Sequence, residues 1–160
     1  MENGDTHQWE HELIARCGLR REELSAHHAR IHIPPIARQL EAIDHPAVAM
    51  TVDVGHLYIA ACDRGFDPVE AAAQAAPWVK HVHVSDNFGL LDRGFDSEAD
   101  RWAFGEADLH MPPGWGAVPY RELFARWPDY RGRLVIELKA PFFDYAAQGL
   151  EKAREIVERP

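Results

Sequence analysis

Along this chain, segments with a strand-like pattern of apolar residues alternate with segments whose apolar residues have helical spacing. Residues 47–53 and 133–138 are mostly apolar, and residues 79–85 alternate valine with histidine, so we predict a buried strand in each segment. Helix-like patterns separate these three segments. Because strands that alternate with helices pair in parallel, the pattern predicts an α/β fold with a parallel sheet.

The helices that follow the predicted strands have recognisable starts. Asp67 is a predicted N-cap and Pro68 a first-turn residue of a helix that continues to Pro77. Pro119 starts a shorter helix before the third strand. Residues near 143–157 form the last predicted helix. Its expected apolar face consists of Ala146, Leu150, Ala153 and Val157.

The pattern of apolar residues over 1–45 predicts irregular helical structure. We expect one helix over 10–15 and a second over 21–32. Pro34 and Pro35 are expected to interrupt the second helix before a third begins. This region also holds histidines with no shared spacing, which we expect to lie in solvent. They are His7, His11, His27, His28 and His32.

Acidic and imidazole side chains occur at the start of the chain, where the strands end, and in the Gly- and Pro-rich segment 87–118. The carboxyl ends of parallel strands meet on one face, so we expect these side chains to converge. We predict one long loop over residues 87–118, and a loop of this length without secondary structure of its own is usually functional. The residues are, in chain order, Glu2, Asp53, His56, His83, Asp86, Asp108, His110 and Glu137. Carboxylates and imidazoles gathered in this way predict a divalent metal site.

Composition narrows the class of protein. The chain has 160 residues and is 46% hydrophobic, which fits one globular domain over residues 1–160. No apolar run approaches the roughly 18–20 residues of a membrane span, and the N-terminal residues do not resemble a signal peptide. Cys17 and Cys62 are far apart in the sequence and belong to no CxxC or zinc-finger motif, so we expect both to be reduced thiols. We therefore expect a cytoplasmic protein with no membrane partner.

The formal net charge is −9. Proteins that bind the phosphate backbone of a nucleic acid usually present a basic face, because lysine and arginine displace the counterions of the nucleic acid. The acidic balance makes nucleic acid an unlikely partner and favours a metal site with a small-molecule substrate.

Five short motifs, taken in order, resemble one family. Residues 53–56 (DVGH) resemble the D-x-x-H that ends the sixth strand of the xylose isomerase-like TIM barrels, and residues 83–86 (HVSD) resemble the H-x-x-D after the seventh. Residues 108–116 resemble the D-x-H…G-x-G of the following loop. Residues 135–137 resemble the eighth strand, which ends in glutamate, and residues 2–3 (EN) resemble the end of the fifth.

The resemblance covers only the second half of such a barrel, from the end of strand five to the helix after strand eight. A complete barrel typically needs about 250 residues. We therefore expect a partial TIM barrel that is completed either by a missing N-terminal half or by self-association. We also expect the inner face of its sheet to be apolar and uncovered.

The resemblance implies a metal-dependent sugar isomerase or epimerase with a sugar-like substrate. Its implied metal ligands are Glu2, Asp53, His83 and Glu137. Three carboxylates and one imidazole suit Mn²⁺, Mg²⁺ or Co²⁺. In related epimerases, the glutamates at the positions of Glu2 and Glu137 also act as acid and base.

The resemblance further implies that His56 binds substrate oxygens. The sequence adds Lys139, which follows the last strand, and Trp115 as candidate substrate contacts.

Two other functions stay open. Apurinic endonucleases belong to the same superfamily, and in a zinc-dependent phosphodiesterase of that kind His56, Asp108 and His110 would surround an additional Zn²⁺. A non-catalytic partial barrel that only binds a partner or a sugar is the third alternative.

Overall fold

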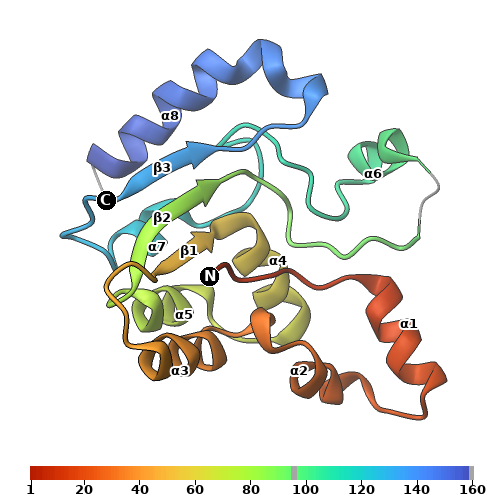
Figure 1. Ribbon diagram of the computed structural model, residues 1–160. Helices are drawn as coiled ribbons and strands as arrows, with labels where there is room; N and C mark the ends of the chain where they lie inside the picture. The colour runs from red at the N-terminus through yellow and green to blue at the C-terminus, as the bar shows by residue number, and fades with distance from the viewer. Residues whose placement is uncertain (95–96, 159–160) are drawn as a thin grey trace.

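The computed structural model describes residues 1–94 and 97–158. In that part of the chain, a parallel sheet has the strand order β1-β2-β3, with β1 at Met50–Asp53, β2 at Val79–Val84 and β3 at Arg133–Ile136. All three predicted strands are present, and each is shorter than predicted. Figure 1 shows the sheet in the middle of the molecule, with α8 beside β3.

Helices and short 3₁₀ segments connect the strands. The two faces of the sheet differ in polarity, and helices cover the apolar face. The helical elements are α1 (Gln8–Arg16), η1 (Arg21–Glu23), α2 (Leu24–His27), η2 (Ala29–Ile31), α3 (Ile33–Ile43), α4 (Val54–Arg64), α5 (Pro68–Ala75), α6 (Glu98–Phe104), α7 (Tyr120–Phe124), η3 (Ala140–Tyr145) and α8 (Ala146–Glu158).

The helix-covered face of the sheet forms the main core. Val52, Val82 and Leu134 lie in register on adjacent strands, and the two valines are fully buried. They pack in one cluster with apolar side chains of α3, α5, α7 and α8. Trp127, just beyond α7, donates from Nε1 to the carbonyl oxygen of Ala72 on α5 at 2.8 Å, so its buried polar atom is satisfied.

The opposite face of the sheet is polar, which corrects the expectation of an apolar inner face. Thr51, His81 and Arg133 are partners across the three strands and therefore lie on the same side. The next level toward the carboxyl ends pairs Asp53 with His83 and His83 with Val135. Of these inward positions only Val135 is apolar, and uncovering this face exposes little apolar surface.

Residues 1–3 continue the sheet beyond β1. Glu2 forms a parallel bridge with Thr51, and the Thr51 N–H donates to the Met1 carbonyl oxygen at 2.7 Å. Residues 1–3 therefore add a short parallel segment to the edge of β1. On the other side of the sheet, no strand among the described residues pairs with the outer edge of β3.

Three local predictions in the helical regions are wrong. The predicted helix over 21–32 is broken into η1, α2 and η2. Pro34 and Pro35 do not interrupt a helix but occupy the first turn of α3, where the missing N–H groups would have no intrahelical partner. The segment 87–118 contains α6, which begins at an N-cap of Ser97.

The face that α8 buries also differs from the prediction. Gly149, Ala153 and Ile156 are buried, whereas Leu150 and Val157 are exposed. The helix is therefore turned so that part of its apolar surface faces away from the core.

Two smaller observations complete the fold. Among the described residues, no helix is long and apolar enough to cross a membrane. Cys17 and Cys62 are both exposed and form no disulfide bond.

Candidate metal centre

The imidazole of His83 lies among three carboxylates. Its Nδ1 atom is 2.9 Å from Oε1 of Glu2, 3.2 Å from Oε1 of Glu137 and 3.8 Å from Oδ2 of Asp53. The structure thus brings together all four residues that the family resemblance implied as metal ligands. They come from residues 2 to 137 of the chain, and the parallel sheet is what makes them neighbours.

Each side chain is positioned by strand pairing or by the end of a strand. His83 is paired with Asp53, the last residue of β1, across the sheet. Glu137 follows β3 directly, and its N–H donates to the carbonyl oxygen of Val84 at 3.0 Å. Glu2 is held by its bridge to Thr51. The register of the sheet therefore sets the geometry of the cluster.

Asp53 has the most constrained position in the cluster. It is fully buried and is the N-cap of α4, with Oδ1 accepting the N–H of His56 at 2.8 Å. Its other carboxylate oxygen, Oδ2, is buried and has no hydrogen-bond partner. Burial raises the pKa of Asp53 to about 6, although the positive charge and the N–H of His56 oppose the shift.

An unpartnered buried carboxylate oxygen is costly unless a cation or a proton neutralises it. One ligand atom from each of Asp53, His83 and Glu137 lies within 4.8 Å of the others. A set of carboxylates with one imidazole matches the ligands that Mn²⁺, Mg²⁺ and Co²⁺ accept in proteins. The donor set and the unpartnered oxygen therefore both fit a divalent cation.

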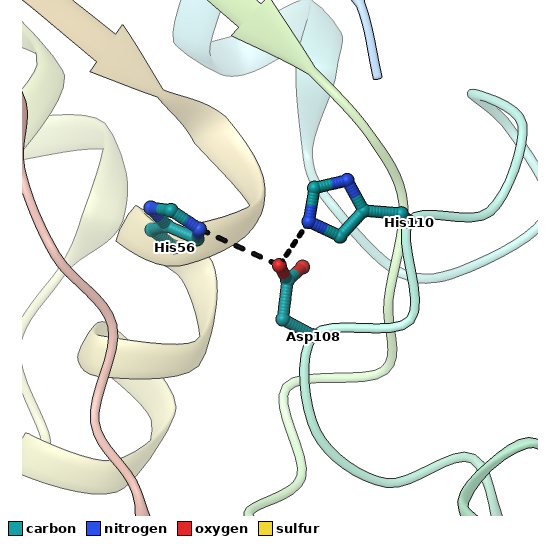
Figure 2. A group of neighbouring side chains, drawn as sticks. All are labelled: His56, Asp108 and His110. Carbon is teal, nitrogen blue, oxygen red and sulfur yellow. Dashed lines mark ion pairs between the residues drawn. The ribbon is translucent and has the colours of Figure 1, made fainter. Parts of the chain in front are cut away.

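A second group of potential ligands adjoins the first. In Figure 2, the carboxylate of Asp108 lies between the imidazoles of His56, at the start of α4, and His110, in the same loop as Asp108. Nε2 of His56 is 3.4 Å from Oδ2 of Asp108, and Nε2 of His110 forms a short ion pair with the same oxygen. Glu2 and Asp53 also group with His56, which links the two clusters.

Charges in the second group stabilise one another. Burial would raise the pKa of Asp108, but hydrogen bonds from His110 and His56 and their positive charges hold it well below its usual range. Burial would lower the pKa of His56, yet Asp108 and Asp53 outweigh it and raise that pKa to about 10. The same balance, with Asp108 as the main partner, raises the pKa of His110. In the absence of a cation, the two imidazoles therefore neutralise the carboxylates.

The two remaining predicted site residues occupy different surroundings. Lys139 lines a pocket together with His110 and Glu137, and its Nζ donates to the carbonyl oxygen of Asp108 at 2.7 Å. Trp115 packs edge-to-face against Tyr145 and Phe142, away from the lining of that pocket. Lys139 thus lies beside the cluster, whereas Trp115 lies against η3.

Two residues that the motifs contained have roles that the sequence did not indicate. Asn3 is buried and bonds to the backbone of Asp53. Asp86 is buried and accepts the N–H groups of Asn87, Gly114 and Val118 at 3.0, 2.7 and 3.1 Å. Asp86 therefore shapes the loop that follows His110. Both residues have polar neighbours in the sequence, so hydrophobic patterning gave no signal of their burial.

The expectation that the N-terminal histidines are solvated is wrong for most of them. His11 is buried and contacts Asp63 at 2.9 Å, and His28 contacts Glu10 at 2.9 Å. His32 contacts Ser25, and His7 lies next to Asp5. Only His27 of this set is exposed. Their partners are distant in the sequence or lie in irregular turns, where spacing carries no information.

Comparison with known proteins identifies the family to which this fold belongs. A family model described as a xylose isomerase-like TIM barrel matches residues 23–158. Among curated proteins, none matches the chain. The crystal structure of a D-tagatose 3-epimerase-like protein has a TM-score of 0.63 and 19% identity, with 98% of this chain and 45% of that chain covered.

Two further solved structures are similar. A xylose isomerase domain protein from Alicyclobacillus acidocaldarius has a TM-score of 0.52 and 22% identity, covering 79% of this chain and 43% of that one. The probable 3-DHS dehydratase AsbF, involved in petrobactin synthesis in Bacillus anthracis, has a TM-score of 0.51 and 18% identity, covering 98% and 59%. This chain spans about half the length of these structures, and the predicted partial TIM barrel is confirmed.

Proposed function

This chain belongs to the xylose isomerase-like TIM barrel family. We propose that it functions as part of a metal-dependent isomerase or epimerase. The proposed reaction moves a proton on the carbon next to a carbonyl group of a small sugar-like substrate. The observation that carries the proposal is the position of three carboxylates around Nδ1 of His83.

Glu2, Asp53, His83 and Glu137 would hold the cation. When bound there, a divalent cation supplies positive charge that stabilises negative charge developing on a substrate oxygen. Asp53 is suited to be the innermost ligand, since it is fully buried and its Oδ2 has no hydrogen-bond partner. Mn²⁺, Mg²⁺ and Co²⁺ are the proposed ions, because the set contains one imidazole and no thiolate.

Glu2 and Glu137 would move the proton. Their side chains are about one-third exposed and contact the same nitrogen of His83, Glu2 from the segment beside β1 and Glu137 from the end of β3. One carboxylate would take the proton from the substrate carbon, and the other would return a proton. General acid–base assistance of this kind is typically worth about 10²–10⁴-fold in rate.

Two further side chains would orient the substrate. His56 lies between the two clusters and can donate a hydrogen bond to a substrate hydroxyl oxygen. Lys139 lines the pocket beside Glu137, where its charge would attract an anionic or electron-rich substrate group.

Solvent isotope exchange tests this proposal. The Mn²⁺-loaded protein is incubated in deuterium oxide with ketohexoses and with hydroxy keto acids, and each compound is analysed by NMR. We expect deuterium on the carbon next to the carbonyl, at least about 100-fold less with Glu137→Gln, and no loss with the exposed control Glu151→Gln. If no compound exchanges while the protein binds Mn²⁺ tightly, the proposed proton transfer is wrong.

The second group of ligands favours one alternative. Asp108 between His56 and His110 offers a second metal position next to the first, as a zinc-dependent phosphodiesterase requires. Incision of abasic DNA by the Zn²⁺-loaded protein, lost in Asp108→Asn and His110→Asn, would establish that function. A protein that binds neither Mn²⁺, Co²⁺ nor Zn²⁺ would instead be a non-catalytic binding module.

A further inference from the structure

A second pocket lies at the amino ends of the strands, away from the candidate metal centre. It has a volume of about 540 Å³, which lies in the range typical of small-molecule sites. Its walls come from the start of β2 and from the segment between α7 and β3, near the tails of the β2 and β3 arrows in Figure 1. We call it the amino-end pocket. Its polar and aromatic lining residues are Lys80, Arg126, Trp127, Asp129, Tyr130 and Arg131.

The charge of the amino-end pocket is opposite to that of the whole protein. The chain has 26 acidic and 17 basic residues. Among the described residues, however, the pocket is lined by three bases and a single acid, Asp129. Nη2 of Arg126 is 3.5 Å from Oε1 of Glu70, whereas neither Lys80 nor Arg131 forms an ion pair in the part of the chain that the structure describes. Positive charge in a hollow attracts anions strongly, because the low-dielectric walls focus its field.

The walls of the amino-end pocket are held in place by contacts of their own. Nε1 of Trp127 donates to a carbonyl oxygen of α5 at 2.8 Å, and Oη of Tyr130 donates to the carbonyl oxygen of Arg133 at 2.5 Å. A Cβ atom on Gly132 would lie 2.3 Å from the carbonyl oxygen of Lys80, so the backbone segments on the two sides of the pocket touch. The pocket is therefore formed before a ligand arrives, which lowers the entropic cost of binding.

We propose that the amino-end pocket binds a small molecule that carries a phosphate group and a flat ring. A phosphate group has close to two negative charges at neutral pH, and Lys80 and Arg131 supply two positive charges that no carboxylate neutralises. Nη1 of Arg131 donates to the carbonyl oxygen of Tyr130 at 2.9 Å, which leaves its other N–H groups for phosphate oxygens. The pocket is larger than a phosphate group needs, and the half-buried ring of Tyr130 offers an apolar surface to the ring of the ligand.

The proposed ligand is separate from the substrate of the metal centre. Asp53 is the last residue of β1 and Glu137 directly follows β3, so the candidate metal centre lies at the carboxyl ends of the strands. The amino-end pocket lies at their opposite ends. A compound bound there does not compete with a substrate at the metal centre, and it stabilises the folded chain by binding to it.

Isothermal titration calorimetry on the metal-free 160-residue chain tests the proposal, with AMP as the probe. We expect saturable binding of AMP, weaker binding of ribose 5-phosphate, which lacks the flat ring, and no detectable binding of adenosine, which lacks the phosphate. Lys80→Ala and Arg131→Ala should each raise the dissociation constant for AMP by about 10-fold or more, because each removes a charged donor. The control Arg154→Ala, at an exposed position of α8, should bind AMP like the wild type.

A gain of affinity separates this proposal from misfolding of a variant. Glu70→Gln removes the carboxylate beside Arg126 and should lower the dissociation constant for AMP by about 2–5-fold. In amide NMR spectra, AMP should shift the resonance of Gly132 and leave that of Gly114, in the loop after His110, unchanged.

Three results would overturn the proposal. They are an absence of saturable AMP binding, binding of adenosine as tight as that of AMP, and unchanged AMP affinity in Arg131→Ala. Because the titrations contain no metal ion, such a result would not bear on the proposed proton transfer at the metal centre.

Discussion

The side chain of Asn3 forms two hydrogen bonds with the backbone of Asp53. Nδ2 of Asn3 donates to the Asp53 carbonyl oxygen at 2.9 Å, and the Asp53 N–H donates to Oδ1 of Asn3 at 2.9 Å. A single amide side chain thus replaces the neighbouring strand that would otherwise pair with Asp53. It also fixes Glu2, the preceding residue, beside the carboxylate of Asp53.

Asn3→Ala is expected to destabilise both the fold and the metal centre. The change leaves the buried N–H and carbonyl groups of Asp53 unpaired, at a cost of about 1–3 kcal/mol for each group. We expect the free energy of unfolding in urea to fall accordingly and the Mn²⁺ affinity to fall at least about 10-fold. Gln74→Ala removes an exposed amide and is the control. Unchanged Mn²⁺ affinity in Asn3→Ala would show that Asn3 does not position the ligands.

Glu137→Ala and His83→Ala are expected to abolish metal binding. Each removes a ligand from a set of four, and the remaining groups cannot surround a divalent ion. Elemental analysis after loading with Mn²⁺, Co²⁺ and Zn²⁺, followed by desalting, should detect about one ion per wild-type chain and none in either variant. Glu151→Ala and His27→Ala change exposed residues of the same types and should retain the ion. A wild-type chain that stays free of metal refutes the assignment.

Asp86→Ala is expected to release the loop after His110. The buried carboxylate accepts N–H groups of Gly114 and Val118, and its loss leaves these donors without a partner. Hydrogen exchange at these two amides should accelerate strongly, and the melting temperature should fall. Asp129→Ala, at an exposed position, should change neither quantity. Continued protection of both amides in Asp86→Ala would mean that other contacts hold the loop.

His32 makes the stability depend on pH. Burial lowers its pKa, and the positive charge of Arg64 lowers it further. The folded protein therefore favours the neutral ring, which contacts Ser25 Oγ at 2.9 Å and packs on Phe66. The stabilisation is complete above the ordinary histidine pKa of about 6.5 and is lost as the pH falls below it toward the lower folded value.

The contribution of His32 can be measured by urea unfolding at pH about 7.5 and at pH about 5.5, which lie on either side of the ordinary histidine pKa of about 6.5. We expect His32→Gln to lose less stability between the two conditions than the wild-type protein does. His27→Gln should behave like the wild type, because His27 is exposed. An equal loss in His32→Gln and wild-type protein would assign the acid sensitivity to other groups.

The sequence was most informative where physical constraints are local. Val82 and Val84 alternate with His81 and His83 because one side of β2 meets helices and the other meets polar groups. Asp67 and Pro68 start α5 through their own backbone and side-chain geometry. Parallel pairing then carries Asp53, His83 and Glu137 to one place, so strand order was sufficient to predict their proximity.

Other features depended on contacts between distant residues. His11 is buried because Asp63, on another helix, can pair with it. Leu150 is exposed although it follows an apolar periodicity, because its side of α8 faces a groove rather than the core. The polarity of the inner face followed from the register of His81 with Thr51 and Arg133, and hydrophobic content alone does not reveal register.

The span between Glu2 and Glu137 also sets an order of assembly. A growing chain presents Glu2 long before β3, and the pairing of β1 with β2 requires neither Glu137 nor α8. The cluster of Glu2, Asp53, His83 and Glu137 is therefore complete only after the last strand has joined the sheet. A cation held by all four residues, as we propose, would bind too late to nucleate folding, and it would instead slow the separation of β3 from the sheet once the sheet has formed.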